Sequence, residues 1–153
     1  MTSNDVPRVR FQRANFIVAD LDRALTLYRD ILGFELEFVK DSPDDSYSYP
    51  VFEIDRQANM RFAVLSTETQ PRVMALTEIK NLALPSLPLP RRSAIVLDIP
   101  DIDGVVSQWQ ATGLPVHDEE RLETHDGRVG REVGMLDYDD NLVVIYHITE
   151  QAN

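Results

Sequence analysis

The sequence predicts an α+β fold made of two βαβββ modules that follow one another along the chain. A strand pattern followed by a helix pattern occurs twice in the same order. Both helices have recognisable start and stop signals, and three strand candidates follow each of them. Because 153 residues suffice for one well-buried core, we expect both modules to belong to a single domain spanning residues 1–153.

The composition excludes several classes of partner and chemistry. The formal net charge of −11 creates an average field that repels phosphate backbones and anionic lipids, so nucleic acid and membranes are poor candidate partners. The chain has no cysteine, which excludes disulfides, thiolate nucleophiles and zinc-thiolate sites. Residues 1–5 are polar, and no stretch approaches the roughly 20 apolar residues of a membrane span, so we expect a cytoplasmic protein.

The first module opens with a short apolar strand at residues 16–18. Asp20 then provides a helix N-cap, and Gly33 suits the left-handed residue that ends a helix. Between them, apolar residues recur at helical spacing at Leu21, Ala24, Leu25, Tyr28 and Leu32. A strand therefore leads into a helix.

The second module repeats this order. An apolar run at residues 94–97 precedes the N-cap candidate Asp101, and Gly113 marks the end of the helix. The helical stripe consists of Ile102, Val105, Val106 and Trp109. The agreement of period and capping signals in both halves is the main support for a duplicated fold.

Three strands are expected after each helix: residues 35–39, 47–54 and 61–65 in the first module, and 116–119, 129–136 and 142–148 in the second. A short helix is expected at 73–81, and three prolines up to Pro90 indicate an extended connector. The expected division is module 1 at about 9–69, a linker at about 70–92 and module 2 at about 93–149. The alternative is a chance repeat within another α+β fold, such as a ferredoxin-like one.

Two segments carry a family resemblance. Residues 15–34, NFIVADLDRALTLYRDILGF, resemble the opening of glyoxalase, bleomycin-resistance and extradiol-dioxygenase proteins, the vicinal-oxygen-chelate superfamily. Residues 135–145, MLDYDDNLVVI, are similar to their closing hairpin. The resemblance implies a glyoxalase-like fold, in which mixed sheets curve around a central pocket that holds a divalent metal. It also implies a homodimer.

The same resemblance identifies the positions that would hold this metal. They fall on Arg13, on Ala94, on Val144 and, in the first module, near Ala63 or Val64. None of these side chains supplies the imidazole or carboxylate donor that such an ion needs, so we expect no cofactor at this site. His117, His125 and His147 do not reproduce a familiar ligand spacing.

Strand alternation suggests which side chains line the pocket. If Arg13 faces inward, Asn15 does too, and Asp98 is a candidate partner for Arg13. Tyr47 and Tyr49 can offer an aromatic wall to a ring-containing ligand. The remaining candidates are Arg61 and Arg131, for carboxylate or phosphate recognition, and Tyr146.

The leading hypothesis is a metal-independent binder of a small organic ligand, aromatic or anionic, similar to the drug-sequestering branch of the family. The alternative is a lyase, isomerase or dioxygenase that uses a relocated metal or metal-free residues, with Asp98 or Glu132 as the base. A purely structural or partner-binding role is the third. The sequence assigns no catalytic residue.

Overall fold

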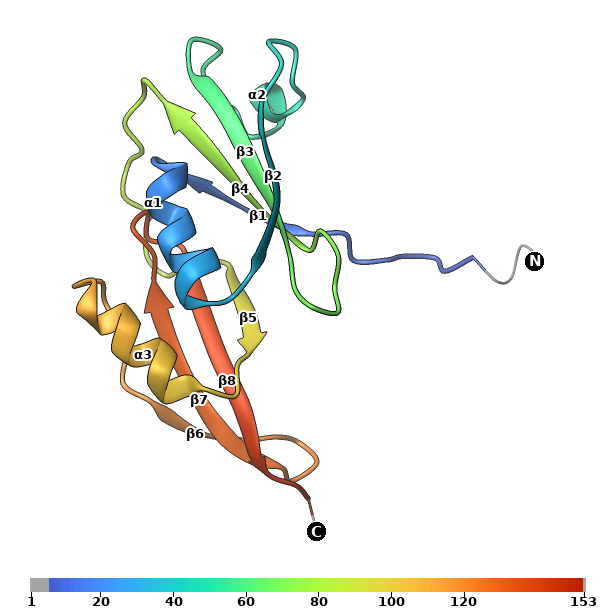
Figure 1. Cartoon of the computed structure of the whole chain (residues 1–153), viewed down its shortest axis with the longest axis vertical. Helices are drawn as coiled ribbons and strands as arrows, with labels where there is room; N and C mark the ends of the chain where they lie inside the picture. The colour runs from blue at the N-terminus through green and yellow to red at the C-terminus, as the bar shows by residue number, and fades with distance from the viewer. Residues whose placement is uncertain (1–5, 153) are drawn as a thin grey trace.

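The computed structural model describes residues 6–152 and contains two four-stranded sheets (Figure 1). The first module consists of β1 (Ala14–Val18), α1 (Leu21–Leu25), the π-helix η2 (Thr26–Ile31), β2 (Glu35–Asp41), α2 (Ser48–Val51), β3 (Asn59–Ser66) and β4 (Met74–Lys80). The second consists of β5 (Ala94–Asp98), α3 (Ile102–Ala111), β6 (Glu120–Glu123), β7 (Val129–Leu136) and β8 (Leu142–Glu150).

Both sheets have the same topology. The strand orders are β1-β4-β3-β2 and β5-β8-β7-β6, with the first two strands of each sheet parallel and the other neighbours antiparallel. The expected fold of two βαβββ modules with mixed sheets is thereby confirmed. β1 and β5 are edge strands, so each keeps one side free of a strand partner.

The capping signals act as the sequence indicates. An Asp20 carboxylate oxygen accepts the backbone N–H of Arg23 at 3.0 Å, and Asp101 accepts that of Gly104 at 3.0 Å. Gly33 follows the first helix with a φ of +92°. The first helix changes to π geometry, because the N–H of Leu32 donates to the carbonyl of residue 27, five positions earlier.

Three of the expected elements were wrong. Residues 47–54 contain the short helix α2 rather than a strand, and residues 74–80 form β4 rather than a helix. β4 misleads because it is covered on both faces: Leu76 joins one hydrophobic cluster and Ile79 the other. The last strand of the first sheet therefore ends at Lys80, and the connection between the sheets spans residues 81–93 instead of 70–92. The strand expected at 116–119 is reduced to one bridge between Val116 and Met135, and β6 begins at Glu120.

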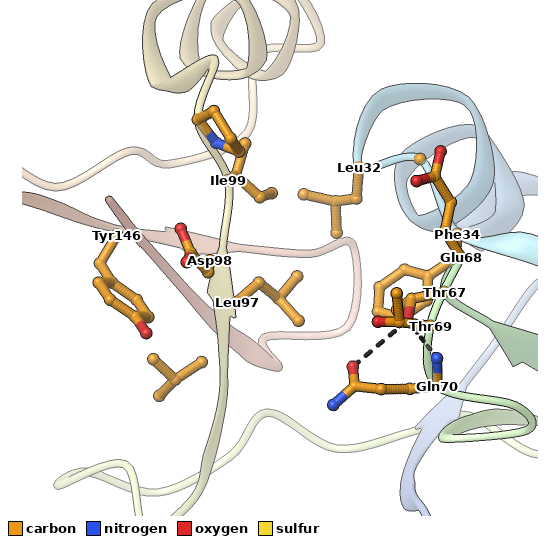
Figure 2. A pocket seen from close by; sticks show the side chains of 13 residues that line it. Leu32, Phe34, Thr67, Glu68, Thr69, Gln70, Leu97, Asp98, Ile99 and Tyr146 are labelled. Carbon is orange, nitrogen blue, oxygen red and sulfur yellow. Dashed lines mark hydrogen bonds between the residues drawn. The ribbon is translucent and has the colours of Figure 1, made fainter. Parts of the chain in front are cut away.

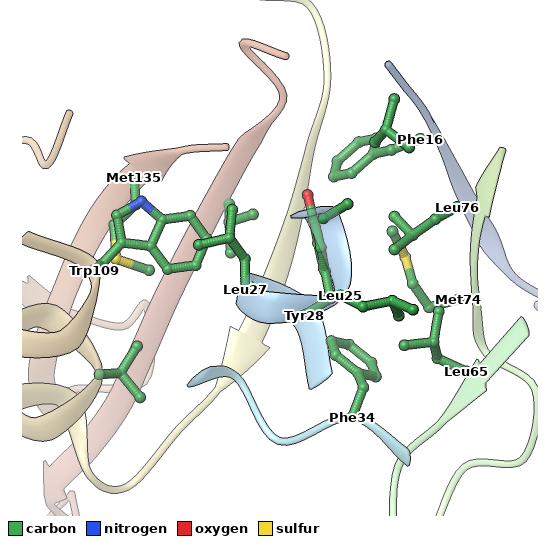
Figure 3. Packing of buried hydrophobic residues seen from close by; sticks show 14 of the residues in the cluster. Phe16, Leu25, Leu27, Tyr28, Phe34, Leu65, Met74, Leu76, Trp109 and Met135 are labelled. Atoms are coloured by element: carbon green, nitrogen blue, oxygen red, sulfur yellow. The ribbon is translucent and has the colours of Figure 1, made fainter. Parts of the chain in front are cut away.

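One hydrophobic cluster joins the two modules. Figure 3 shows Leu27 and Tyr28 of η2 lying between Leu76 of the first sheet and Trp109 of α3. Tyr28 and Phe16 form an edge-to-face pair with ring centroids 6.3 Å apart. The helix-covered faces of both sheets thus share a core. Within residues 6–152, none of the helices has the length and apolar character needed to cross a membrane.

A polar contact also fastens the second module to the first. It comes from the turn between β7 and β8, residues 137–141, in which Asn141 Nδ2 donates a hydrogen bond to the carbonyl of Ile17 at 3.1 Å. The N–H of Ala19 donates to Asp139 Oδ1 at 3.1 Å. The Tyr28 hydroxyl donates to a carboxylate oxygen of Asp137 at 2.7 Å. The turn therefore closes the end of β1.

Candidate functional site

The register of the sheets fixes which residues stand at the positions of the family's metal ligands. β1 pairs Asn15 with Ala75, and β5 pairs Val96 with Val144. Asn15 and Val96 both lie five residues before the capping Asp of their module. The counterpart of Val144 is therefore Ala75, not Ala63 or Val64, which lie on β3.

The side chains at these positions do not fit a divalent ion. Arg13 is exposed and adds positive charge, while Ala75, Ala94 and Val144 have no donor atom. Among residues 6–152, no group of three or more His, Asp or Glu side chains gathers closely enough to hold a metal. No step of chemistry can therefore be assigned to an ion at the four inherited positions.

A cavity of about 670 Å³ lies beside β5, between the two modules (Figure 2). Its walls come from residues 32–34 after η2, residues 67–70 in the β3–β4 turn, residues 96–100 of β5 and its extension, and Tyr146 of β8. A smaller cavity of about 300 Å³ continues along β5 toward Phe11 and Ala14. We refer to the larger one as the β5 cavity.

The free edge of β5 explains where this cavity lies. The N–H of Ile99 donates to the carbonyl of Tyr146, so alternate residues such as Val96 and Asp98 direct their backbone groups away from β8. Across the gap, the turn is held by its own hydrogen bonds: the N–H of Thr67 donates to the carbonyl of Gln70 at 3.0 Å, and the N–H of Gln70 donates to Thr67 Oγ1 at 3.0 Å. Two ordered walls therefore face each other.

The cavity combines apolar walls with a few polar groups. Figure 2 shows Leu32 and Phe34 across from Leu97, whereas Asp98 and Tyr146 lie on the other side of β5. Asp98 and Tyr146 are register partners, and Asp98 Oδ1 lies 2.9 Å from Nδ1 of His147. This arrangement suits a ligand with an apolar body and one polar end.

Two of the eight site residues expected from the sequence, Asp98 and Tyr146, line the β5 cavity. Of the others, Arg13 is exposed ahead of β1, and Asn15 Oδ1 accepts a hydrogen bond from Thr77 at 2.8 Å. Tyr47 is 77% exposed, whereas Tyr49 is buried and donates to the carbonyl of Ala58 at 2.8 Å. None of these four lines either cavity.

Arg61 and Arg131, the remaining two, are held by carboxylates of the chain itself. Arg61 Nε donates to Glu78 Oε1 at 2.8 Å, and Arg131 Nη2 donates to Glu119 and Asp103 at 2.6 Å each. Hydrogen bonds to Glu119 and Asp103 raise the pKa of Arg131, and the Arg131 guanidinium lowers the pKa of both carboxyls. Neither arginine lines a cavity.

Sequence reasoning missed the wall opposite β5. Leu32 was assigned to a helix end, Phe34 to a strand start and Gln70 to the linker, while Thr67 fell between a strand and the linker. Nothing in a local pattern brings these segments together. One signal was available. Pro100 precedes the capping Asp101 where Ala19 precedes Asp20, so the second module lacks a backbone donor that the first one uses.

Comparisons with known proteins agree with the fold. Residues 10–145 match the sequence profile of the Glyoxalase/Bleomycin resistance protein/Dioxygenase superfamily. A search of curated proteins gave no significant match. A glyoxalase family protein from Bacillus cereus superposes with a TM-score of 0.70 at 15% identity, covering 96% of this chain and 99% of that one.

Two other solved structures are similar at lower scores. The trypanothione-dependent glyoxalase I of Leishmania major gives a TM-score of 0.58 at 18% identity, covering 91% of this chain and 86% of its own. The fosfomycin resistance protein FosX of Listeria monocytogenes, crystallised with Mn(II) and sulfate, gives 0.54 at 15% identity and covers 90% of both chains. At these identities the structures establish the fold alone. Because the profile match spans most of the chain, the protein belongs to the Glyoxalase/Bleomycin resistance protein/Dioxygenase superfamily.

Proposed function

We propose that the protein binds a small organic molecule in the β5 cavity and does so without the divalent ion implied by its family. The observation that carries the proposal is the cavity itself. At about 670 Å³ it falls within the usual range for small-molecule sites, roughly 300–1,000 Å³. Its apolar walls can bury a ligand body, while Asp98, Tyr146 and Gln70 offer a few orienting polar groups.

The metal-independent part of the proposal rests on donor chemistry. A transition-metal site needs several imidazole or carboxylate ligands, and the four inherited positions carry one arginine and three aliphatic side chains. FosX was crystallised with Mn(II), but a similar fold at 15% identity does not transfer that ion to a chain lacking the ligands. Ligand binding therefore has to draw on apolar contact and hydrogen bonds.

A fragment titration followed by ¹H–¹⁵N NMR tests the site. With aromatic and branched aliphatic fragments, we expect the largest amide shifts at residues 67–70 and 95–98. Val96→Trp places an indole in the cavity and should abolish these shifts. Val51→Trp, at a residue on α2 that is also exposed but lines neither cavity, is the matched control and should leave binding unchanged.

Elemental analysis of the purified protein tests the absence of the metal. We expect substoichiometric zinc, iron and manganese, and fragment affinities that do not change after chelator treatment. A stoichiometric transition metal, or binding that requires added metal, would contradict the proposal. Fragment binding that survives Val96→Trp unchanged would place the ligand site elsewhere.

A further inference from the structure

The β5 cavity exists because the duplication of the two modules is broken at one point. At the end of β1, the turn 137–141 closes the edge, and the N–H of Ala19 donates to Asp139 Oδ1 at 3.1 Å. The equivalent residue at the end of β5 is Pro100, which has no N–H. The corresponding turn of the first module, residues 67–73, therefore cannot make the same seal.

The geometry on the two sides differs accordingly. The turn 137–141 is short and contacts Ile17 and Ala19 directly. The β3–β4 turn runs between the paired residues Leu65 and Met74 and lines an open cavity opposite β5. The first module therefore has a hydrogen-bonded turn at the end of its edge strand, whereas the second module has an open cavity at the equivalent position.

The charge around the gap has one sign. The residues that line the β5 cavity include two carboxylates, Asp98 and Glu68, and no arginine, lysine or histidine. Figure 2 shows Asp98 on the side of β5 that is turned away from Leu97, and Glu68 on the turn across from β5. The surrounding second module, residues 94–150, has 13 acidic residues against 3 arginines. The cavity therefore repels anions and attracts cations.

The carboxylate of Asp98 is accessible to a ligand. Its side chain is 57% exposed, and among the described residues its Oδ1 lies 2.9 Å from Nδ1 of His147. An uncharged imidazole hydrogen-bonds the carboxylate without neutralising it. Tyr146, the register partner of Asp98, lies beside it and offers a hydroxyl to the same polar end of a ligand.

We propose that the β5 cavity selects an organic cation: an ammonium or guanidinium group joined to an aromatic or branched aliphatic body. The cationic group contacts Asp98, with Glu68 as the weaker second carboxylate on the opposite wall. The body packs against Val96, whose side chain extends from the same face of β5 as Asp98. The proposal rests on the proposed function. Of the aromatic or anionic ligand expected from the sequence it keeps the aromatic body and replaces the anionic group, because no arginine predicted to bind an anion lines the cavity.

Three probes of the same shape and different charge test the selection. 1-Naphthylmethylamine, 1-naphthalenemethanol and 1-naphthoate are titrated by ¹H–¹⁵N NMR at pH 8, where histidine side chains are ordinarily neutral. The amine should bind about tenfold more tightly than the alcohol, and the carboxylate should bind most weakly. A single half-exposed carboxylate of this kind raises the affinity for a cation roughly two- to fivefold.

Charge-neutralising variants locate the effect. Asp98→Asn should lower the amine affinity roughly two- to fivefold and the alcohol affinity by a smaller factor, and Glu68→Gln should have a smaller effect on the amine than Asp98→Asn. Asp118→Asn is the control, because Asp118 is an exposed acid of the same module that lines neither cavity. All three variants remove one negative charge, so a loss confined to the cavity variants separates local contact from the general field.

The outcomes distinguish the two proposals. Equal affinity for the amine and the alcohol, or equal losses in Asp98→Asn and Asp118→Asn, would overturn the cation selection while the proposed function stands. No cavity shift with any probe, together with no shift in the fragment titration, would overturn both.

Discussion

Glu78 is the most completely buried charged side chain of the described core, with 2% exposure. Its carboxylate accepts the N–H of Leu21 at 2.6 Å and two bonds from Arg61, at 2.8 and 3.2 Å. Burial raises the pKa of Glu78, but the hydrogen bonds from Arg61 and Leu21 and the charges of Arg61 and Lys80 outweigh it, so the pKa lies below its ordinary value. The carboxylate joins β4 to β3 and to the start of α1.

We expect Glu78→Gln to lower the free energy of unfolding by about 2 kcal/mol at pH 7, because the hydrogen bonds to a charged acceptor are lost. A depressed native pKa stabilises the fold above the unfolded pKa, near 4.5, and this stabilisation disappears as the pH falls through the native value. The difference between the variant and the wild type should therefore shrink below about pH 4.5. Urea unfolding from pH 3 to 7 measures it.

Glu120→Gln is the control for this measurement, since Glu120 is exposed. It should change stability little at any pH. A constant difference between Glu78→Gln and the wild type from pH 7 down to pH 3 would contradict the assigned linkage.

Tyr28 supplies the second residue-scale prediction. Burial raises the pKa of Tyr28 well above 10, and the nearby Asp137 charge raises it further. A raised native pKa gives stability that is complete below the unfolded pKa of about 10 and is lost as the pH rises through the native pKa. Tyr28→Phe should cost about 1–2 kcal/mol at pH 7, because Asp137 loses a buried donor.

The same variant should flatten the alkaline limb of the stability curve. Between pH 9 and 11, wild type should lose more stability than Tyr28→Phe, as followed by urea unfolding. A double-mutant cycle with Asp137→Asn isolates the pair, and a coupling energy near zero would show that the hydrogen bond does not join the modules.

At the scale of elements, the main helix of each module is followed by a glycine in the left-handed conformation. Gly33 has a φ of +92° and Gly113 one of +82°, and an added Cβ would meet no atom within 4 Å at either position. Alanine at either site should therefore cost only the backbone strain of the left-handed region, about 1–2 kcal/mol. Thermal unfolding measures this, with Ser107→Ala on the exposed side of α3 as the control. A neutral Gly33→Ala would show that the loop relaxes.

Elements with apolar residues on one face or in one clear run were predictable from the sequence, and elements without such a pattern were not. α1 and α3 follow from the 3.6-residue stripe and the aspartate caps, and β7 and β8 from apolar runs between turn residues. β4 is buried on both faces, so its alternation disappears and residues 73–81 resembled a helix. Residues 47–54, with Tyr49 buried and Tyr47 exposed, have strand-type composition but form α2 and a turn.

The candidate site was predictable only in part, for a similar reason. Asp98 and Tyr146 follow from strand parity on β5 and β8, two strands that were placed correctly. The opposite wall comes from a helix end and a turn whose approach depends on how the two modules pack, which is a property of tertiary contacts rather than of local sequence. Arg61 and Arg131 bind internal carboxylates and lie outside the cavity, and the sequence cannot separate such an arginine from one that binds a ligand, because the two have the same sequence pattern.

At the scale of the whole molecule, one face of each sheet is covered by the shared helical core, and the opposite face of the first sheet is covered only in part, by the cluster around Tyr49 and Ile79. On the exposed part of that face, Phe38 is 43% exposed and forms an edge-to-face pair with Phe62, with ring centroids 6.0 Å apart. Exposed aromatic side chains of this kind can mark an association surface.

We therefore expect two copies to associate through this exposed part of the first sheet, as a two-fold symmetric dimer. Multi-angle light scattering after gel filtration should give about twice the mass of the 17.5 kDa chain. Phe38→Glu should shift the protein toward the monomer, because a charge buried at such an interface is costly. Leu82→Glu adds the same charge at another exposed apolar residue, in the connector after β4, and should leave the dimer intact. A monomer at 100 µM wild-type protein, or equal dissociation in both variants, would refute association through the sheet faces.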